Sequence, residues 1–201
     1  MNASSETSYK KTTQALNFLA CKKDGKINKM KAIKLIYLAD RLHLRKYGRT
    51  VVGDIYWAMK LGPVGSRAKN VAELSSIPEN ILSYAKKYIR PIDKKKHHLE
   101  SIKQVDLDVF SKTDIECLEA VYDKFSDKDQ FELKDLTHQY PEWLKYEREL
   151  KTGKKRVKMN YDDLFSSTEK GDSLFGESRT SLNLVKELFD ELKEMSEFFS
   201  R

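Results

Sequence analysis

Hydrophobic positions recur at helical spacing along most of the chain. The first such stretch covers residues 12–23, where apolar side chains follow three- and four-residue steps. A second helix is predicted over residues 28–46, where apolar residues cover more than one stripe, as in a helix that packs on several sides. Asn28 is a favourable N-cap for it, and Gly48 can adopt the left-handed conformation that ends a helix.

The second half of the chain contains further helix boundaries. Ser111 opens a predicted helix in the manner of a capping box, with Asp114 in place of the usual glutamate. Pro141 suits the first turn of a later helix, because its missing N–H would have no helical partner there, and Pro63 is interpreted in the same way. The last helix is predicted over residues 180–199, with its apolar residues on one side.

β-Branched and aromatic residues mark two strand regions. One is a strand near residues 54–60, and the other is a hairpin near residues 88–103, in which Pro91 would confine its strand to a sheet edge. Together these elements predict an α+β fold, mostly α, with six to seven helices and a small antiparallel sheet. Around this domain we expect a disordered tail at residues 1–10, a polar loop region at 151–178, and a C-terminal helix at 179–201 packed on the same domain.

Charge is distributed unevenly along the chain. Charged residues make up 34% and hydrophobic residues 39%, which is enough core material for a globular fold with an unusually charged surface. The formal net charge is +7, but residues 1–100 contain 21 Lys and Arg against 8 Asp and Glu, whereas residues 101–201 contain 17 against 23. This asymmetry either gives a dipolar surface with one face suited to an acidic partner, or lets the two halves attract each other within one fold.

Several features point to the cytoplasm. The chain has no run of 18 apolar residues, and residues 1–11 lack the apolar segment of a secretory signal. Cys21 and Cys117 lie 96 residues apart, which suits reduced thiols better than a disulfide framework. We therefore expect a cytoplasmic protein that does not associate with membranes.

The sequence carries no catalytic signature. Its glycines form neither a phosphate-binding nor a dinucleotide-binding pattern, and the adjacent His97 and His98 would point to opposite faces of a strand. Cys21 and Cys117 lie at apolar helical positions, so both are expected to be buried. We expect no cofactor, no metal and no enzyme activity; an active site assembled from distant residues is the open alternative.

Basic residues gather on the second predicted helix. Lys34, Arg41 and Arg45 share one face of it, which Arg49 continues. The first two helices, joined by a short turn, resemble a helix-turn-helix pair, so a DNA-binding regulator is an alternative function. A helix that is apolar on most sides is more typical of a core element, however, so we favour a solvated basic face that does not bind nucleic acid.

One ordered set of residues is more specific than these patterns. It consists of Lys-Leu-Ile-Tyr-Leu-Ala-Asp at 34–40, Tyr-Gly-Arg at 47–49, Ala-Met-Lys-Leu-Gly-Pro-Val at 58–64, Leu-Lys-Asp-Leu-Thr-His at 133–138 and Pro-Glu-Trp at 141–143. The order of these blocks resembles the SocA-like family, also called the Panacea domain. The residues that carry the resemblance are Lys34, Leu35, Tyr37, Asp40, Gly48, Trp57, Gly62, Pro63, Val64, His138 and Trp143.

The resemblance implies an antitoxin that neutralises a co-encoded toxin by direct contact, with the family domain over residues 11–150. Such proteins are encoded in bacterial chromosomes, prophages and phages. From the residues themselves, we expect Leu35 and Tyr37 in the core, and a strand-to-helix turn at Gly62. His138 is expected to hydrogen-bond across two helices near Trp143. Each of these residues is interpreted as scaffold, with direct partner contact as the alternative.

Two surfaces compete as the toxin-binding site. The C-terminal helix has more apolar residues than one docking face requires, including Phe189 and Phe198, and amphipathic helices often bind in a groove of a partner. The alternative is a basic surface made of Arg41, Arg45, Arg49 and Lys60. We expect that truncation after Gly176 abolishes neutralisation and leaves a folded remainder.

Overall fold

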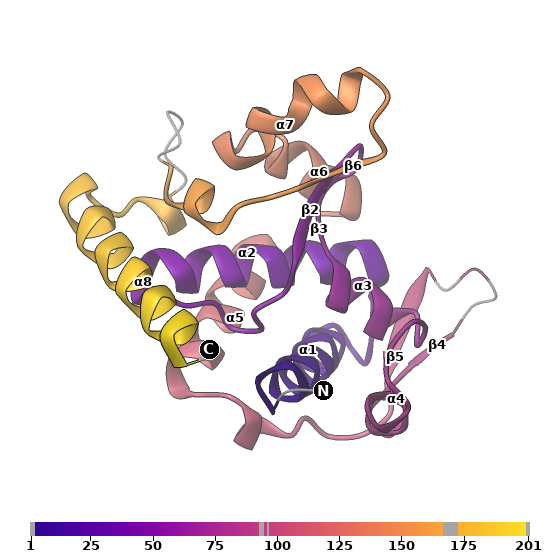
Figure 1. The fold of residues 1–201 in the computed structure, drawn as a ribbon. Coiled ribbons are helices and arrows are strands. Elements are labelled where there is room, and N and C mark those ends of the chain that lie inside the picture. Colours follow the sequence, from indigo (N-terminus) through magenta and orange to yellow (C-terminus); the bar gives the residue numbers. More distant parts are fainter. Residues whose placement is uncertain (1–2, 93–94, 96, 167–172, 200–201) are drawn as a thin grey trace.

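The computed structural model describes residues 3–92, 95, 97–166 and 173–199 (Figure 1). Within these ranges the chain forms eight α-helices, which are α1 (Ala3–Lys22), α2 (Lys29–Tyr47), α3 (Ser66–Ala72), α4 (Glu79–Ala85), α5 (Lys112–Phe125), α6 (Gln130–Thr137), α7 (Pro141–Lys151) and α8 (Arg179–Phe199). The strands are β1 (Lys26–Asn28), β2 (Tyr56–Met59), β3 (Gly62–Gly65), β4 (Ile89–Pro91), β5 (His98–Ser101) and β6 (Arg156–Lys158). Three short 3₁₀ turns are η1 (Leu107–Val109), η2 (Tyr161–Phe165) and η3 (Ser173–Phe175).

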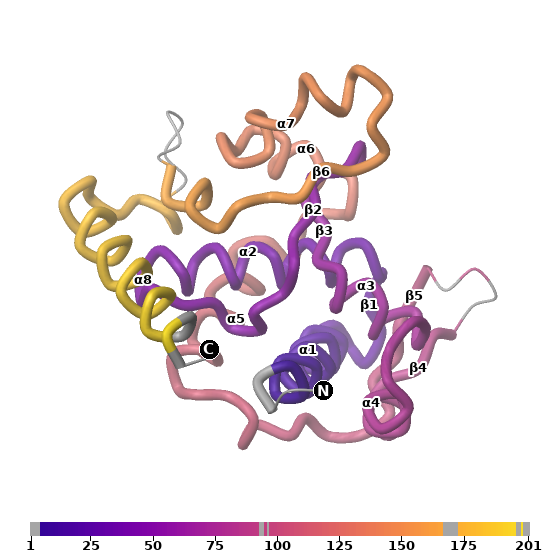
Figure 2. The backbone as a smooth tube through the Cα atoms, viewed as in Figure 1, coloured from indigo at the N-terminus to yellow at the C-terminus, as the bar shows by residue number. Residues whose placement is uncertain are grey.

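Helix α2 is the central element of the fold. Every residue from Lys31 to Arg45 is buried, because α1, α3, α5, α6 and α8 all pack against it. Figure 2 shows α2 between α1 on one side and the α6–α7 lobe on the other, with α8 across its C-terminal end. The predicted caps are confirmed: the Asn28 side chain accepts from the Lys31 N–H, and Gly48 has a φ of +68°.

The strands form two three-stranded antiparallel sheets, with the orders β1-β5-β4 and β3-β2-β6. The predicted hairpin near residues 88–103 is β4–β5, and Pro91 lies on an edge strand as expected. In the other sheet, β2 pairs with β3 through Trp57 opposite Val64, and with β6 through Met59 opposite Arg156. The overall class, α+β and mostly α, is confirmed.

Several boundaries differ from the prediction. The described residues contain eight helices rather than six or seven, and two small sheets rather than one. Residues 62–65 form β3, so α3 begins at Ser66 and not at Pro63. Proline is tolerated there because β3 is an edge strand, where the missing N–H leaves no ladder bond unmade. The predicted polar loop region contains strand β6, which pairs with β2.

The N-terminal segment also differs from expectation. Residues 3–10 belong to α1, where a disordered tail was predicted. An ion pair between Lys10 and Glu6 spans one helical turn, and Tyr9 packs against the core, which together extend the helix beyond its apolar stretch. Cys117 is buried as predicted, but Cys21 is exposed, with its Sγ atom 3.0 Å from the Ser101 hydroxyl.

Local helix signals were more reliable. Ser111 and Asp114 form the expected capping box of α5, and Pro141 occupies the first turn of α7. A second capping box, between Asp129 and Glu132 at the start of α6, follows the same rule and was not predicted. No helix among the described residues is both long enough and apolar enough to cross a membrane.

Candidate functional site

Residues from three separate sequence blocks meet around the amine of Lys34. This side chain is 1% exposed, and its Nζ atom donates a hydrogen bond to the Pro63 carbonyl oxygen at 3.1 Å. Gly62 has a φ of +90°, and a Cβ atom there would lie 2.6 Å from Lys34 Nζ and 2.8 Å from Thr137 Oγ1. Burial lowers the pKa of Lys34 to about 7. The first two residues of β3, Gly62 and Pro63, are therefore packed closely around a lysine amine.

His138 and Trp143 form a stacked pair beside this cluster. Their ring centroids are 3.7 Å apart with an interplanar angle of 9°. The Trp143 indole N–H donates to the Met59 carbonyl oxygen at 3.1 Å, which joins α7 to strand β2. The hydrogen bond predicted for His138 is wrong, because its buried Nε2 atom has no hydrogen-bond partner. Burial, followed by the charge of Lys34, lowers the pKa of His138 to about 4, so its ring is neutral at pH 7.

A cleft of about 690 Å³ opens beside the stacked pair. Below it is called the α7 cleft, and its lining residues are Lys60, His138, Trp143, Glu147, Leu150, Lys151, Gly153, Lys154 and Lys155. The sequence contains two signals of this cleft, which the predicted sites do not include. The first signal is the spacing of Trp143, Glu147, Leu150 and Lys151, whose steps of four, three and one residues place them on one face of α7. The second is the pair of basic residues, Lys154 and Lys155, that follows shortly afterwards.

Trp57 lies on strand β2, in the sheet β3-β2-β6. Its indole N–H donates to the Ser66 hydroxyl at 2.7 Å, which attaches the sheet to the start of α3. The guanidinium of Arg156 lies 4.4 Å from the centre of its ring. The outer face of this small sheet is therefore covered by a basic side chain.

A second buried group links α2 to α7. The Tyr37 hydroxyl and the Arg41 Nε–H both donate to Glu142 Oε1, at 2.6 Å and 2.5 Å. The Arg41 guanidinium lies 4.4 Å and 4.5 Å from the ring centres of Tyr140 and Phe175. Burial alone would lower the pKa of Arg41, but the Glu142 carboxylate raises it, so the arginine is charged inside the core.

Asp40 holds the connection between α2 and β2. Its carboxylate accepts from the Val52 backbone N–H and from the Tyr56 hydroxyl, each at 2.9 Å. Burial raises the pKa of Asp40 to about 7 in spite of these hydrogen bonds. Asp54 plays a similar part at α3, where it accepts from the N–H groups of Arg67 and Ala68. Both aspartates therefore act as local backbone acceptors.

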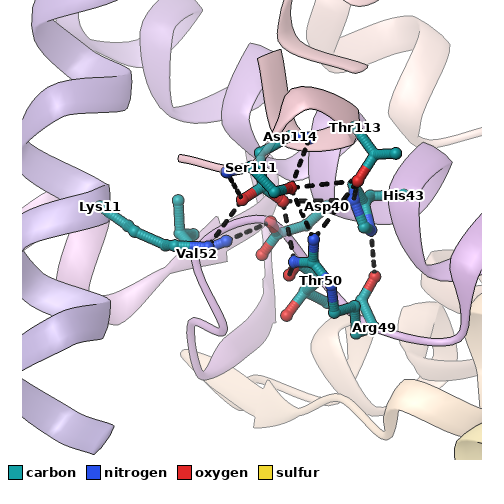
Figure 3. A network of polar contacts seen from close by, with 9 residues as sticks. All are labelled: Lys11, Asp40, His43, Arg49, Thr50, Val52, Ser111, Thr113 and Asp114. Atoms are coloured by element: carbon teal, nitrogen blue, oxygen red, sulfur yellow. Dashed lines mark hydrogen bonds and ion pairs between the residues drawn. The ribbon is translucent and has the colours of Figure 1, made fainter. Parts of the chain in front are cut away.

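Asp114 is the centre of a polar network at the other end of α2 (Figure 3). Its carboxylate lies 2.7 Å from Lys11 Nζ, 2.8 Å from Arg49 Nη1 and 3.2 Å from His43 Nε2. The other ring nitrogen of His43 contacts the Arg49 carbonyl oxygen at 2.8 Å. Burial lowers the pKa of His43. Burial alone would raise the pKa of Asp114, but hydrogen bonds from Lys11 and from the Ser111 backbone N–H outweigh it, so the pKa of Asp114 is lowered.

Arg45 attaches the segment before α8 to α2. It pairs with Glu177 at 3.0 Å, and its guanidinium donates to the carbonyl oxygens of Leu164, Ser166 and Phe175 at 2.9–3.3 Å. The side chain is 1% exposed. One buried arginine thus accounts for three backbone carbonyl groups at the ends of η2 and η3.

The predicted basic face of α2 is wrong. Lys34, Arg41 and Arg45 are buried because other elements cover α2 on all sides, and each is held by the contacts described above. Arg41 and Arg45 are therefore inaccessible to a partner, whereas Arg49 is partly exposed and Lys60 is exposed. A recognition helix needs a free face for the major groove, and α2 has none between residues 31 and 45.

Helix α8 carries an exposed apolar stripe. It packs inward through Leu182, Val185 and Phe189, and the Phe189 ring lies 5.6 Å from that of Phe165. Phe189 is thus partly buried against the fold, and its role at a partner surface stays a prediction. The outer stripe, whose members are 44–74% exposed, consists of Leu184, Leu188, Leu192, Met195 and Phe198.

No group of three or more His, Cys, Asp or Glu residues in the described part of the chain is arranged to hold a metal ion. The model of one family, the antitoxin SocA-like Panacea domain, matches residues 33–144, which is more than half of the chain. This match contains every residue of the Lys34 cluster and the His138–Trp143 pair, and it ends before most of the α7 cleft. Neither the curated proteins nor the solved structures contain a match.

Proposed function

The chain belongs to the family of SocA-like antitoxins with a Panacea domain, and from this premise we propose that it neutralises a co-encoded toxin protein by direct contact. Family membership suggests the antitoxin role, and the surface of the molecule suggests how contact is made. The observation that carries the proposal is the exposed apolar stripe of α8. Exposed contiguous apolar patches on soluble domains typically mark interaction sites.

The burial of the family residues indicates that they serve as scaffold and that the toxin is bound elsewhere. Lys34, Leu35, Tyr37 and Asp40 are all buried, and so are Gly62 and Pro63. Their hydrogen bonds hold α2, the β2–β3 hairpin and the α6–α7 region together. We infer that the family motif maintains the fold, and that toxin specificity resides on surfaces outside it.

The stripe on α8 has the spacing of a helix that docks in a groove. Leu184, Leu188, Leu192 and Met195 follow steps of four, four and three residues, so they lie in one row. Exposed glutamates at 187, 191 and 194 form a parallel row beside them. A partner groove that is apolar at its floor and basic at its rim would complement both rows.

Co-expression with the toxic reading frame that neighbours the gene tests the proposal. Wild-type protein is expected to restore growth and to co-purify with the toxin. Leu184→Asp combined with Met195→Asp places two charges in the stripe at positions that are 63% and 56% exposed, so the fold is retained while rescue and co-purification are lost. Phe131→Asp is the matched control, because Phe131 is 55% exposed on α6, and it should rescue as wild type does.

The outcomes separate the parts of the proposal. If wild-type protein does not neutralise the neighbouring toxin, the antitoxin function is refuted. If the double variant still rescues growth, α8 is not the docking element, and the exposed Lys60 and Arg49 become the next surface to test. Truncation after Gly176 is a poorer test than the sequence suggested, because it also removes the buried Leu182 and the ion-pair partner of Arg45.

A further inference from the structure

We propose that the α7 cleft is a binding site for a nucleotide, with its phosphates on the lysines and its base against the His138–Trp143 side. This inference is independent of the antitoxin proposal, since it rests on a different surface. The cleft lies between the β2–β3 turn, the end of α6, one face of α7 and the segment that leads into β6. Its volume of about 690 Å³ lies within the range of ordinary small-molecule sites, roughly 300–1,000 Å³.

The charge of the lining favours an anion. Lys60, Lys151, Lys154 and Lys155 come from three structural segments, and all four are exposed. Glu147 is the one acidic lining residue, and it pairs with Lys151 at 3.0 Å. Lys154 pairs with Glu149, but Lys60 and Lys155 form no ion pair with any residue that the structure describes. The β2–β6 register, with Met59 opposite Arg156, brings these two lysines side by side, where both are available to a ligand.

The basic residues of the lining are of a type that binds phosphate. Lysine is a common phosphate ligand, because its compact charge can contact phosphate oxygens from several directions. The lining contains four lysines and no arginine. Because a concave wall of low dielectric constant focuses the field of these charges, they act together on a compact polyanion.

The remaining walls are suited to a flat ring. Leu150, Trp143 and the neutral imidazole of His138 form the apolar and aromatic part of the lining. Trp143 is fixed by its hydrogen bond to Met59, so this side is rigid before any ligand binds. Aromatic surfaces of this kind hold nucleobases by stacking without strong sequence preference. A mononucleotide combines both requirements, a polyanion and a flat ring, at the size of the cleft.

Calorimetric titration of the full chain with ATP and GTP tests the proposal, with adenosine and inorganic pyrophosphate as half-ligands. We expect saturable binding of the nucleotides, and binding at least about tenfold weaker for each half-ligand. Lys60→Glu combined with Lys155→Glu should weaken nucleotide binding by at least about tenfold. Lys112→Glu is the control, because it makes the same change of charge at one site outside the cleft, where Lys112 is 91% exposed on α5. The Lys112→Glu variant should bind nucleotide as wild type does.

Tryptophan fluorescence tests whether the nucleotide binds in the α7 cleft. In a Trp57→Phe background, Trp143 is the one remaining tryptophan, and its emission should change on nucleotide binding. Binding without a change in Trp143 emission overturns the proposal, and so does an equal loss in the Lys112 control. Pyrophosphate or an acidic peptide that binds as tightly as ATP refutes the nucleotide class. A single-stranded oligonucleotide that binds more tightly than mononucleotides assigns the surface to nucleic acid instead, and also refutes the proposal.

Discussion

The amine of Lys34 donates a hydrogen bond to the carbonyl oxygen of Pro63, and this contact joins two motif blocks that lie 29 residues apart in the sequence. The amine is enclosed so tightly that its pKa falls to about 7. A charged group in this position is disfavoured, because few polar atoms replace its hydration shell.

The enclosed amine predicts a dependence of stability on pH. The pKa of Lys34 is about 7 in the folded protein and 10.5 in the unfolded chain, so between these values the unfolded chain binds the extra proton. The free energy of unfolding should therefore rise as pH increases from 7, by at most about 1.4 kcal/mol per pH unit from this group. Urea unfolding of wild type and Lys34→Met at pH 7 and pH 9 measures it. An equal change in both proteins between the two pH values would refute the assignment.

Gly62 and Gly153 provide a matched pair of backbone tests. Both have positive φ, at +90° and +100°, but a Cβ atom at Gly62 would collide with Lys34 Nζ, whereas Gly153 has open space. Each change to alanine costs about 1–2 kcal/mol from the backbone conformation. We expect Gly62→Ala to lower Tm by several degrees more than Gly153→Ala, given about 2–4 °C per kcal/mol at this chain length. Equal melting temperatures would show that Lys34 moves aside freely.

The sequence predicted those features that depend on neighbouring residues. Asn28, Ser111 and Pro141 start helices where expected, because capping involves atoms within one turn. The sharing of one helix face by Arg41 and Arg45 was also correct. Periodicity alone could not show that this face is buried, since the partner of Arg41 is Glu142, 101 residues away.

The candidate sites show the same difference between features set by neighbouring residues and features set by distant contacts. The motif residues were expected to be scaffold, and burial of Leu35 and Tyr37 agrees with the expected core. The α7 cleft was not anticipated, because it requires β6 to pair with β2, and no local rule specifies a pairing between residues 57 and 158. The stacking of His138 on Trp143 likewise follows from how α6 meets α7, and not from their spacing.

The buried Glu142 should be more important to stability than an exposed acid. Glu142→Gln leaves Arg41 charged and without its counterion inside the core, which costs about 3–5 kcal/mol. Tyr37→Phe removes one hydrogen bond to the same oxygen and should cost about 0.5–1.5 kcal/mol. Glu116→Gln, which breaks an exposed pair with Lys112, should change stability by less than about 1 kcal/mol. Chemical denaturation of the three variants gives this order, and a small effect of Glu142→Gln would contradict it.

Binding to duplex DNA is expected to be too weak to measure at physiological salt. Helix α2 has no free face over residues 31–45, so the helix-turn-helix alternative lacks its recognition element. A regulator with about six phosphate contacts would lose around a thousandfold in affinity between 50 and 200 mM salt. Electrophoretic mobility shifts with the sequence upstream of its own gene, taken at both salt concentrations, test this. A tight, salt-dependent shift would overturn the expectation.

Arg45 should control how firmly α8 is held. Its guanidinium donates to the carbonyl oxygens of Leu164, Ser166 and Phe175 and pairs with Glu177, so one side chain of α2 contacts η2, η3 and the residues just before α8. Arg45→Met keeps a long apolar stem but removes the donor to the carbonyl oxygens of Leu164 and Phe175, which are buried residues. We expect faster amide hydrogen exchange over residues 173–189, and little change in α1, which packs elsewhere.

Arg49→Met is the control for this last variant, because Arg49 belongs to the Asp114 network and contacts none of these carbonyls. It should accelerate exchange near residues 111–114 and leave α8 protected. If α8 presents the toxin-binding stripe, Arg45→Met should also reduce rescue of growth, since the stripe must then be ordered again on binding. Unchanged exchange over residues 173–189 in Arg45→Met would show that Leu182 and Phe189 hold α8 by packing alone, with no need for the buried arginine.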